Sequence, residues 1–288
     1  MMRVLDLFSG IGGFSLGLER AGGFETVAFC EIEAFPRAVL AKHWPKVLCY
    51  DDVRTLTAER LAADGIAVDV ICGGFPCQDI SLSGNLAGIN EGTRSGLWSE
   101  IARLVGELGP RFVIVENVTN LLSGPAGRPG EWFGKILGDL AALGYDAEWH
   151  SILASAVGAQ HHRDRVWIVA YPNKTHSIGK RIPGRLAPKH VWPGDGGEVV
   201  ADALRNGQQG LRQFVEPFYS APAINRQTID AFYGRFASQW QIEPTLGRVA
   251  DGVPNRSHRL AALGNAVVPQ IPEMIGNAIL ARIKEATP

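Results

Sequence analysis

Cys77 follows Pro76 in the stretch "GGFPCQDIS", residues 73–81, directly after the apolar run "VDVIC". Cysteine is usually buried as a small apolar residue. A thiol at the point where a strand ends and a polar loop begins can instead reach a ligand, and its thiolate is a strong nucleophile. Cys77 is therefore the first candidate for covalent chemistry.

Glu116 directly follows the strand-like apolar run "RFVIV", residues 111–115, and is the first residue of the stretch "ENV". A carboxyl group at a strand end beside a cleft can give or take a proton during a reaction. The alternative interpretation is a charge-paired strand terminus, and it would be favoured if Glu116 stood alone. Its position one strand after Cys77 favours a shared site.

Two arginines follow in "AQHHRDRVW", residues 159–167, with one residue between them. In a strand, Arg163 and Arg165 would share one face. Two guanidinium groups there could fix a phosphate or a carbonyl oxygen and favour a nearby thiolate. His161 and His162 are adjacent and would point to opposite faces, so a shared metal site is not expected.

A glycine-rich turn, "DLFSGIGG" at residues 6–13, lies between the first apolar run and the first helical pattern. Glycine allows a tight turn and close approach of a ligand to the backbone. The spacing is not the complete G-x-G-x-x-G of dinucleotide-binding proteins, so alone it is a weak signal. The three glycines expected to contact a cofactor are Gly10, Gly12 and Gly13.

Two acidic residues at later strand ends extend this predicted cofactor site. Glu31 lies about 20 residues after the glycines, where a ribose-hydroxyl acceptor is expected. Asp52, in the stretch "YDDV", could accept from the exocyclic amine of an adenine. Ligands bind at the strand ends of such sheets, which supports both assignments. The alternative for Glu31 is a solvated strand end.

Strand-like and helix-like segments alternate over the first 170 residues. The strands and helices that they predict must position the candidate residues. Alternation with nearly continuous apolar strands predicts an α/β fold with a doubly wound, mostly parallel sheet. The predicted strands cover residues 3–8, 25–32, 68–74, 111–118, 146–153 and 165–171. The predicted helices cover residues 12–22, 34–44, 97–109, 131–144 and 265–286.

The pattern weakens after Pro172, where glycine, proline, arginine, asparagine and glutamine become frequent. We therefore predict three parts. Residues 1–171 form a catalytic and cofactor-binding domain, residues 172–259 a smaller second lobe, and residues 260–288 a helix that returns to the first domain. Up to residue 170 the chain carries 14 Lys and Arg against 20 Asp and Glu, and afterwards 14 against 9. A basic lobe that meets phosphates is one interpretation, and chance variation among solvated faces is the other.

Composition narrows the class of protein. The 288-residue chain has a net charge of -1, which argues against general binding to polyanions. No run approaches the ~20 apolar residues of a membrane span, and the first residues do not form a secretory signal. The four cysteines show no metal-binding or disulfide spacing. We expect a cytoplasmic enzyme that needs no metal and no membrane.

These segments, in this order, resemble the DNA (cytosine-5) methyltransferase family. "DLFSGIGGF" is similar to the family's first motif, "GGFPCQDIS" to its nucleophile loop and "ENV" to its glutamate motif. "QHHRDRVWIVA" resembles its arginine strand and "LGNAVVPQ", residues 263–270, its last motif. Ala266 departs from the serine common at its position, and Gln160-His161-His162 depart from the usual residues before the arginines. The resemblance covers residues 1–170 and roughly 246–288.

The resemblance implies a mechanism and partners. The Cys77 thiolate would attack C6 of a cytosine flipped out of duplex DNA, and Glu116 would protonate N3. Arg165 would hold the base carbonyl oxygen, while Arg163 would support the loop or a phosphate.

The resemblance also implies a cofactor and partners. The methyl donor would be S-adenosylmethionine and the product S-adenosylhomocysteine. A monomer is expected, with a cognate restriction endonuclease as a possible partner in the same cell. Residues 172–259 correspond to the target-recognition lobe. The further cofactor contacts implied are Phe8, Pro76, Asn265 and Val267.

Three alternatives stay open at this point. An RNA cytosine-5 methyltransferase could use the same scaffold, although the sizeable variable lobe favours DNA. A nicotinamide-dependent oxidoreductase would account for the glycine turn and Glu31 but leaves Cys77, Glu116 and the arginines unexplained. A catalytically inactive DNA-binding relative would not need the complete set of catalytic residues.

Overall fold

The computed structural model describes residues 1–76, 95–124, 130–159, 161, 163–173 and 256–285. In chain order its elements are β1 Met2–Leu7, α1 Gly13–Arg20, β2 Phe24–Cys30, α2 Ala34–His43, β3 Leu48–Tyr50, α3 Ala58–Ala63, β4 Val70–Gly73, the 3₁₀ helix η1 Ser95–Leu97, α4 Trp98–Leu108, β5 Phe112–Val118, η2 Thr119–Leu122, α5 Glu131–Ala142, β6 Tyr145–Leu153, η3 Ala154–Val157, β7 Asp164–Pro172, α8 Arg256–Asn265 and α9 Gln270–Glu285.

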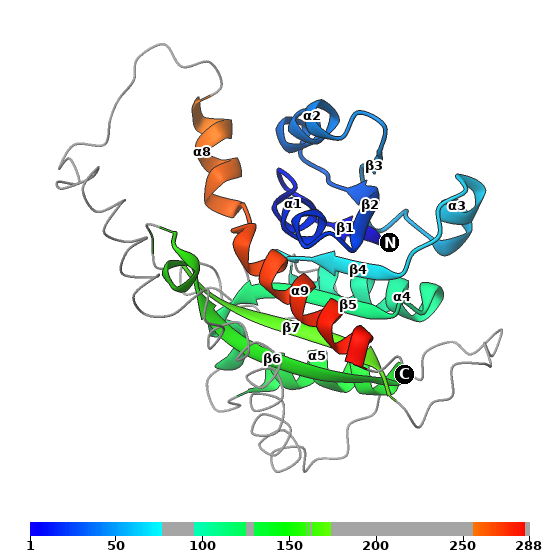
Figure 1. Cartoon of the computed structure of the whole chain (residues 1–288), viewed down its shortest axis with the longest axis vertical. Coiled ribbons are helices and arrows are strands. Elements are labelled where there is room, and N and C mark those ends of the chain that lie inside the picture. The colour runs from blue at the N-terminus through cyan, green and yellow to red at the C-terminus, as the bar shows by residue number, and fades with distance from the viewer. Residues whose placement is uncertain (77–94, 125–129, 160, 162, 174–255, 286–288) are drawn as a thin grey trace. The chain divides into compact units, whose positions relative to one another are not determined.

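The seven strands belong to one mixed sheet in the order β3-β2-β1-β4-β5-β7-β6 (Figure 1). The pairs β1/β2, β2/β3 and β4/β5 are parallel, whereas β7 runs antiparallel to β5. Helices alternate with these strands along the chain. The predicted α/β class with a mostly parallel sheet is therefore confirmed.

The chain divides into two compact units. Among the described residues, the first unit contains Met1–Val53, those of Ile152–Asp164, and helices α8 and α9. The second contains Arg54–Ser151 and strand β7 from Arg165. The predicted boundary near residue 172 adjoins the residues from 174 to 255, which lie outside the description, so that boundary stays a prediction.

Within the first unit, strands β1, β2 and β3 pair side by side in the sheet. The register runs from Met2 opposite Phe24 to Leu7 opposite Cys30, and β3 continues it beside Cys30. Most side chains of β1 and β2 are buried, as expected for parallel strands. The carboxyl ends of β1 and β2 therefore meet at one edge, where the glycine turn and Glu31 lie.

Helix α9 packs against α1 through glycines. A Cβ atom at Gly17 would lie 2.2 Å from the carbonyl oxygen of Pro269, and one at Gly276 would lie 3.0 Å from the Cβ of Ala21. Only residues without a side chain allow the two backbones to approach so closely. The C-terminal helix therefore returns to the helix that follows the glycine turn.

The C-terminal region differs from the single helix expected over residues 265–286. Two helices occur, α8 and α9, joined by a short non-helical segment, residues 266–269 (Figure 1). Proline disfavours helical backbone at the residue before it, here Val268. Pro269 therefore separates the two helices. None of the described helices combines the length and apolar character needed to cross a membrane.

In the second unit, β5 lies between β4 and β7. Its register places Val115 opposite Gly73 on β4 and Glu116 opposite Trp167 on β7. The strand is buried except at its ends. Glu116 therefore sits at the carboxyl end of β5, close to the point where β4 also ends.

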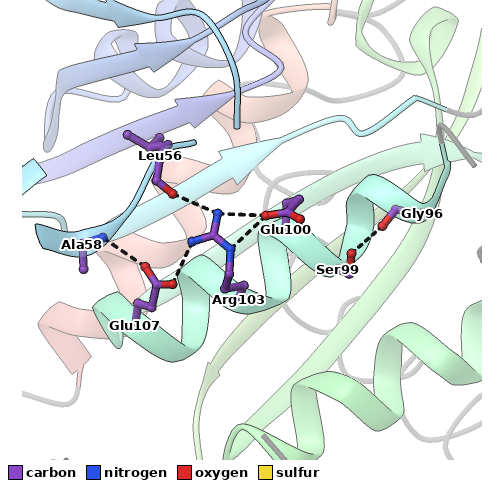
Figure 2. Close-up of polar contacts among 7 residues, drawn as sticks. All are labelled: Leu56, Ala58, Gly96, Ser99, Glu100, Arg103 and Glu107. Carbon is purple, nitrogen blue, oxygen red and sulfur yellow. Dashed lines mark hydrogen bonds and ion pairs between the residues drawn. The ribbon is translucent and has the colours of Figure 1, made fainter. Parts of the chain in front are cut away.

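An arginine on α4 ties that helix to the segment leading into α3, as Figure 2 shows. Arg103 forms ion pairs with Glu100 at 2.8 Å and Glu107 at 2.7 Å, and its Nη2 donates to the carbonyl of Leu56 at 2.9 Å. Glu107 also accepts from the backbone N–H of Ala58, the first residue of α3, at 3.0 Å. The carboxylate satisfies a donor at a helix N-terminus and suits its dipole.

Candidate active site

Glu31 is held at the end of β2 by two backbone donors. Its Oε2 accepts from the N–H of Gly10 at 2.7 Å, and its Oε1 accepts from the N–H of Glu33 at 2.8 Å. The residue is only 8% exposed. The structure therefore brings together the predicted glycine turn and the predicted ribose acceptor, with both carboxylate oxygens used as acceptors.

The glycine turn has a constrained backbone and one open position. Phe8 adopts a φ of 52°, which is uncommon for a residue with a side chain. Ser9 closes the turn, because its hydroxyl donates to the carbonyl of Asp6 at 2.6 Å and its carbonyl accepts from the Gly12 N–H at 2.9 Å. A Cβ atom at Gly10 would meet nothing within 4 Å. Gly10 is thus the position where a ligand could approach the backbone.

The other two glycines of the turn are needed for packing. A Cβ atom at Gly12 would lie 2.7 Å from the ring of Trp44, and one at Gly13 would lie 2.4 Å from the carbonyl oxygen of Val267. Trp44 is oriented by its indole N–H, which donates to Glu19. The predicted contact residue Val267 therefore lies against the start of α1, directly beside the glycine turn.

Asp52 belongs to the same edge of the first unit. The pKa of Cys30 is raised to about 12, chiefly because the thiol is buried and in addition because Cys49 and the Asp52 and Glu31 carboxylates lie nearby. Burial also raises the pKa of Cys49. Both thiols stay neutral near pH 7, and a neutral thiol is a poor nucleophile. The structure therefore makes Cys30 and Cys49 unsuitable for covalent chemistry.

Glu116 and Arg165 form an ion pair in the second unit. The Nε of Arg165 lies 3.0 Å from the Oε1 of Glu116, and the two side chains are 23% and 10% exposed. The pairing of β5 with β7 places them on neighbouring strands. A charged, largely buried pair of this kind holds the carboxyl group in a fixed position.

The loop that leads to Cys77 is fitted to this ion pair. A Cβ atom at Gly74 would lie 2.9 Å from the Oε2 of Glu116, so only glycine leaves room for the carboxylate. Asn117 donates from Nδ2 to the carbonyl of Phe75 at 3.0 Å, and the Phe75 ring packs against Trp98. Residues 74–76 are thus held beside Glu116 by the next residue of the same strand.

Cys77 itself lies outside the described residues, which end on this side at the half-buried Pro76. Its role stays a prediction that rests on the position of the chain leading to it. Within the described ranges, no His, Cys, Asp and Glu side chains gather into a group of three that could hold a metal ion.

Arg163 contacts a different part of the chain from Arg165. Its guanidinium donates to the carbonyl of Gly264 and, at 3.2 Å, to that of Asn265. Strand β7 begins at Asp164, so the alternation that predicted a shared face does not extend to Arg163. Asn265, a predicted cofactor contact, is exposed and its carbonyl is one of the two acceptors.

Sequence reasoning missed three residues that position the site: Ser9, Trp44 and Asn117. Asn117 lies within the quoted "ENV" stretch, where only the glutamate received a role. A polar residue at a strand end, next to a candidate catalytic group, is a signal that could have identified it. Trp44 contacts the glycine turn from another helix end, and nothing in the local sequence marks that contact.

Comparison with known proteins identifies the family. The model of the C-5 cytosine-specific DNA methylase family matches residues 2–206. The chain is 34% identical to the Type II methyltransferase M.FnuDI of Fusobacterium nucleatum, with 96% of this chain and 90% of that protein covered. The chain belongs to the C-5 cytosine-specific DNA methylase family. The prediction from the five motifs is confirmed.

Other members of the DNA methylase family are longer. The chain is 34% identical to the Type II methyltransferase M.AluI of Cellulosimicrobium cellulans, covering 88% of this chain and 47% of that one. It is also 34% identical to M2.BsuMI of Bacillus subtilis, covering 59% and 42%. The chain thus spans about half the length of several curated relatives that it matches.

A solved structure of low identity shares the methylase fold. A DNA modification methyltransferase encoded within a prophage (E. coli) aligns over 99% of this chain and all of that one, with a TM-score of 0.59 and 20% sequence identity. At that identity the similarity shows the fold alone.

Proposed function

We propose that this chain is a DNA (cytosine-5) methyltransferase that transfers a methyl group from S-adenosylmethionine to C5 of a cytosine in duplex DNA. The observation that carries the proposal is the Glu116–Arg165 ion pair, held beside the loop that leads to Cys77. Membership of the C-5 cytosine-specific DNA methylase family supports the same reaction.

The reaction needs a nucleophile because C5 of cytosine lies in an aromatic ring and reacts poorly. Addition of the Cys77 thiolate to C6 forms a C–S bond, breaks the conjugation and makes C5 electron-rich. After C5 is methylated, its proton leaves to a base and the C6–S bond breaks, which restores the ring and the thiolate. Covalent catalysis of this kind divides one difficult step into easier ones.

Glu116 and Arg165 act on the base during that addition. Negative charge develops on the ring as the thiolate adds. Glu116, once its carboxylate has taken up a proton from solvent, gives that proton to N3 and neutralises the charge. Arg165, which already holds the Glu116 carboxyl group, would hold the base carbonyl oxygen with its remaining donors. The proton returns to Glu116 when the C–S bond breaks.

The first unit has residues that fit S-adenosylmethionine. Glu31 offers acceptor oxygens for ribose hydroxyls, and Gly10 leaves its backbone open to a ligand. Asp52, at the same edge, would accept from the adenine amine, and Phe8, Asn265 and Val267 would add contacts from the same unit. Pro76, which the resemblance to the family also implies, belongs to the second unit. S-Adenosylmethionine supplies the methyl group when bound and leaves as S-adenosylhomocysteine.

Within a duplex the cytosine ring is stacked, so the target base must be flipped out. Unstacking costs a few kcal/mol, which contacts to phosphates and to the base pocket must offset. The net positive charge after residue 170 suits residues 172–259 to phosphate contacts, although residues 174–255 lie outside the described part. We further propose that the enzyme acts as a monomer in the cytoplasm, with a cognate restriction endonuclease as its partner.

The deciding experiment follows a labelled methyl group from S-adenosylmethionine into nucleic acid. Duplex DNA should become labelled, and its hydrolysis should release the label as 5-methyl-2′-deoxycytidine. Label in transfer RNA but not in DNA would instead favour the RNA methyltransferase. The nicotinamide-dependent oxidoreductase does not agree with the family assignment, and an inactive relative would label neither substrate.

The Glu31→Gln variant should weaken cofactor binding while leaving the chemical step unchanged. Both carboxylate oxygens accept from backbone N–H groups, so a glutamine must turn its own NH₂ toward one of those donors. Loss of a hydrogen bond to a charged group costs about 1.5–3 kcal/mol, roughly a 10- to 100-fold rise in KM for S-adenosylmethionine. Steady-state kinetics at varied cofactor concentration measure this.

Glu33→Gln is the matched control for this prediction, because Glu33 is exposed and its side chain makes no capping hydrogen bond to α2. That variant should retain the wild-type KM. Equal KM values in the Glu31→Gln variant and the wild type would remove Glu31 from the cofactor site.

A further inference from the structure

We infer that Arg163 is a positioning residue: it caps the C-terminus of helix α8 and thereby fixes the segment that completes the cofactor site. This inference rests on the proposed function and changes the role expected for Arg163, which was to support the catalytic loop or a phosphate. The starting observation is that its guanidinium donates to the carbonyls of Gly264 and Asn265, the last two residues of α8.

Those two carbonyls need a donor from elsewhere. The last four carbonyl groups of a helix have no partner within the helix, and the helix dipole places partial negative charge there. Basic side chains in the last turn often compensate for this, but α8 has none in its last turn. A planar guanidinium can donate to two neighbouring acceptors at once. Arg163 supplies both the donors and the positive charge that α8 lacks.

Arg163 comes from a fixed part of the first unit. Its own carbonyl accepts from the N–H of Ala154, at the start of η3, at 3.1 Å, and the next residue begins β7. The cap therefore joins α8 to the backbone at the start of η3, within the same unit. Without it, α8 has few anchors in the described structure, because Ala262 is buried while Leu260 and Leu263 are 58% and 64% exposed.

The capped end of α8 leads directly to the cofactor site. Residues 266–269 follow the cap, and the carbonyl oxygens of Val267 and Pro269 lie where Cβ atoms at Gly13 and Gly17 would collide with them. The backbone of residues 266–269 therefore packs closely against α1, next to the glycine turn, and a small shift of this segment would change that contact. Arg163 sets the direction in which the chain enters it. Because Arg163 and Arg165 contact different groups, we assign Arg163 to cofactor binding and Arg165 to the base.

The test compares three variants by S-adenosylhomocysteine binding without DNA, by turnover at saturating S-adenosylmethionine, and by amide hydrogen exchange. Arg163→Met keeps the aliphatic stem and removes every donor. We expect its Kd for S-adenosylhomocysteine to rise about tenfold, the loss expected for charge-assisted bonds at a helix terminus. Exchange at residues 266–268 should rise too, while kcat stays within about threefold of the wild type, because a positioning residue acts through binding. Arg163→Gln keeps one donor group and should shift Kd in the same direction by a smaller factor.

Lys135→Met on α5 is the control, since Lys135 forms an i,i+4 ion pair with Asp139 and takes no part in the site. It should match the wild type in all three measurements. A kcat loss in Arg163→Met with unchanged Kd would overturn the inference and place Arg163 at the base. A reduced salt dependence of DNA binding, also with unchanged Kd, would place it on a phosphate. If Arg163→Met does not fold, a folded Arg163→Gln protein with wild-type Kd overturns the inference.

Binding and exchange require neither DNA nor methyl transfer, so the two proposals fail separately. A wild-type protein that binds S-adenosylhomocysteine but labels no DNA would reject the proposed function, while the Arg163 variants would still report on the cap. A wild-type protein that methylates DNA, with Arg163 variants that bind cofactor normally, would reject only the role of Arg163.

Discussion

The Cys77→Ser variant is expected to lose methyl transfer to duplex DNA, by a factor of at least about 10⁴, the scale seen when a nucleophile is removed from an enzyme. A serine hydroxyl is far less ionised than a thiol near neutral pH and adds poorly to C6. Without the addition, C5 stays part of an aromatic ring and the methyl group has no nucleophile to accept it. Transfer of labelled methyl groups measures the loss, and S-adenosylhomocysteine binding should be unchanged.

Cys49→Ser provides the matched control for this prediction. Burial raises the pKa of Cys49, and the contact of its Sγ with the Tyr50 carbonyl is one that a serine hydroxyl can also make. That variant should keep wild-type turnover. If Cys49→Ser lost activity and Cys77→Ser kept it, the nucleophile would be misassigned.

A trapped adduct tests the covalent bond itself. DNA with 5-fluorocytosine at the target site has no C5 proton to release, so the C6–S bond should persist. The wild-type protein should then migrate with the DNA in denaturing gels, and Cys77→Ser should not. Complexes that separate fully in denaturant would contradict the covalent mechanism, even if methylation of ordinary DNA were normal.

Most of the strand positions could be predicted because burial determines residue type so strongly in parallel sheets. The runs ending at Leu7, Gly73 and Val118 read as strands in the sequence and are strands in the structure. The carboxyl ends of such strands gather at one edge. That rule accounts for the contact between the Gly10 N–H and the Glu31 carboxylate.

Short elements and chain reversals were harder to predict. Strand β3 has three residues and α3 has six, too few to show a clear period in hydrophobicity. Helix α8 lies where the sequence is polar and weakly periodic, and most of its residues are exposed. Its position is set by contacts such as those of Arg163, which join residues far apart in the chain.

The roles of glycines and arginines depend on such distant contacts. Gly12 and Gly13 are expected in a ligand-binding turn, yet each also makes room for a residue from another part of the chain, Trp44 and Val267. Arg163 and Arg165 look equivalent at a spacing of two, yet one caps a helix and the other pairs with Glu116. Spacing predicts which face a side chain occupies, whereas its partner is decided by tertiary structure.

The Glu116→Gln variant is expected to lower kcat by about 10²–10⁴-fold, the usual contribution of a general acid. Glutamine has nearly the same shape, and its amide oxygen can take the place of the carboxylate Oε1 that lies 3.0 Å from the Nε of Arg165. It has no proton to give to N3, so charge that develops on the ring is not neutralised. Single-turnover methylation at saturating cofactor measures the step, and S-adenosylhomocysteine binding should not change.

The matched control is Glu100→Gln, because Glu100 also pairs with an arginine, Arg103, at 2.8 Å in the same unit but on α4. Loss of that ion pair should leave turnover at the wild-type level.

The Gly74→Ala variant moves the Glu116 carboxyl group without removing it, since the new Cβ would lie 2.9 Å from the Glu116 Oε2. Turnover should fall in both site variants and not in Glu100→Gln. If Glu116→Gln and Glu100→Gln were equally active, Glu116 would serve only as the partner of Arg165, and N3 would have to receive its proton from another group.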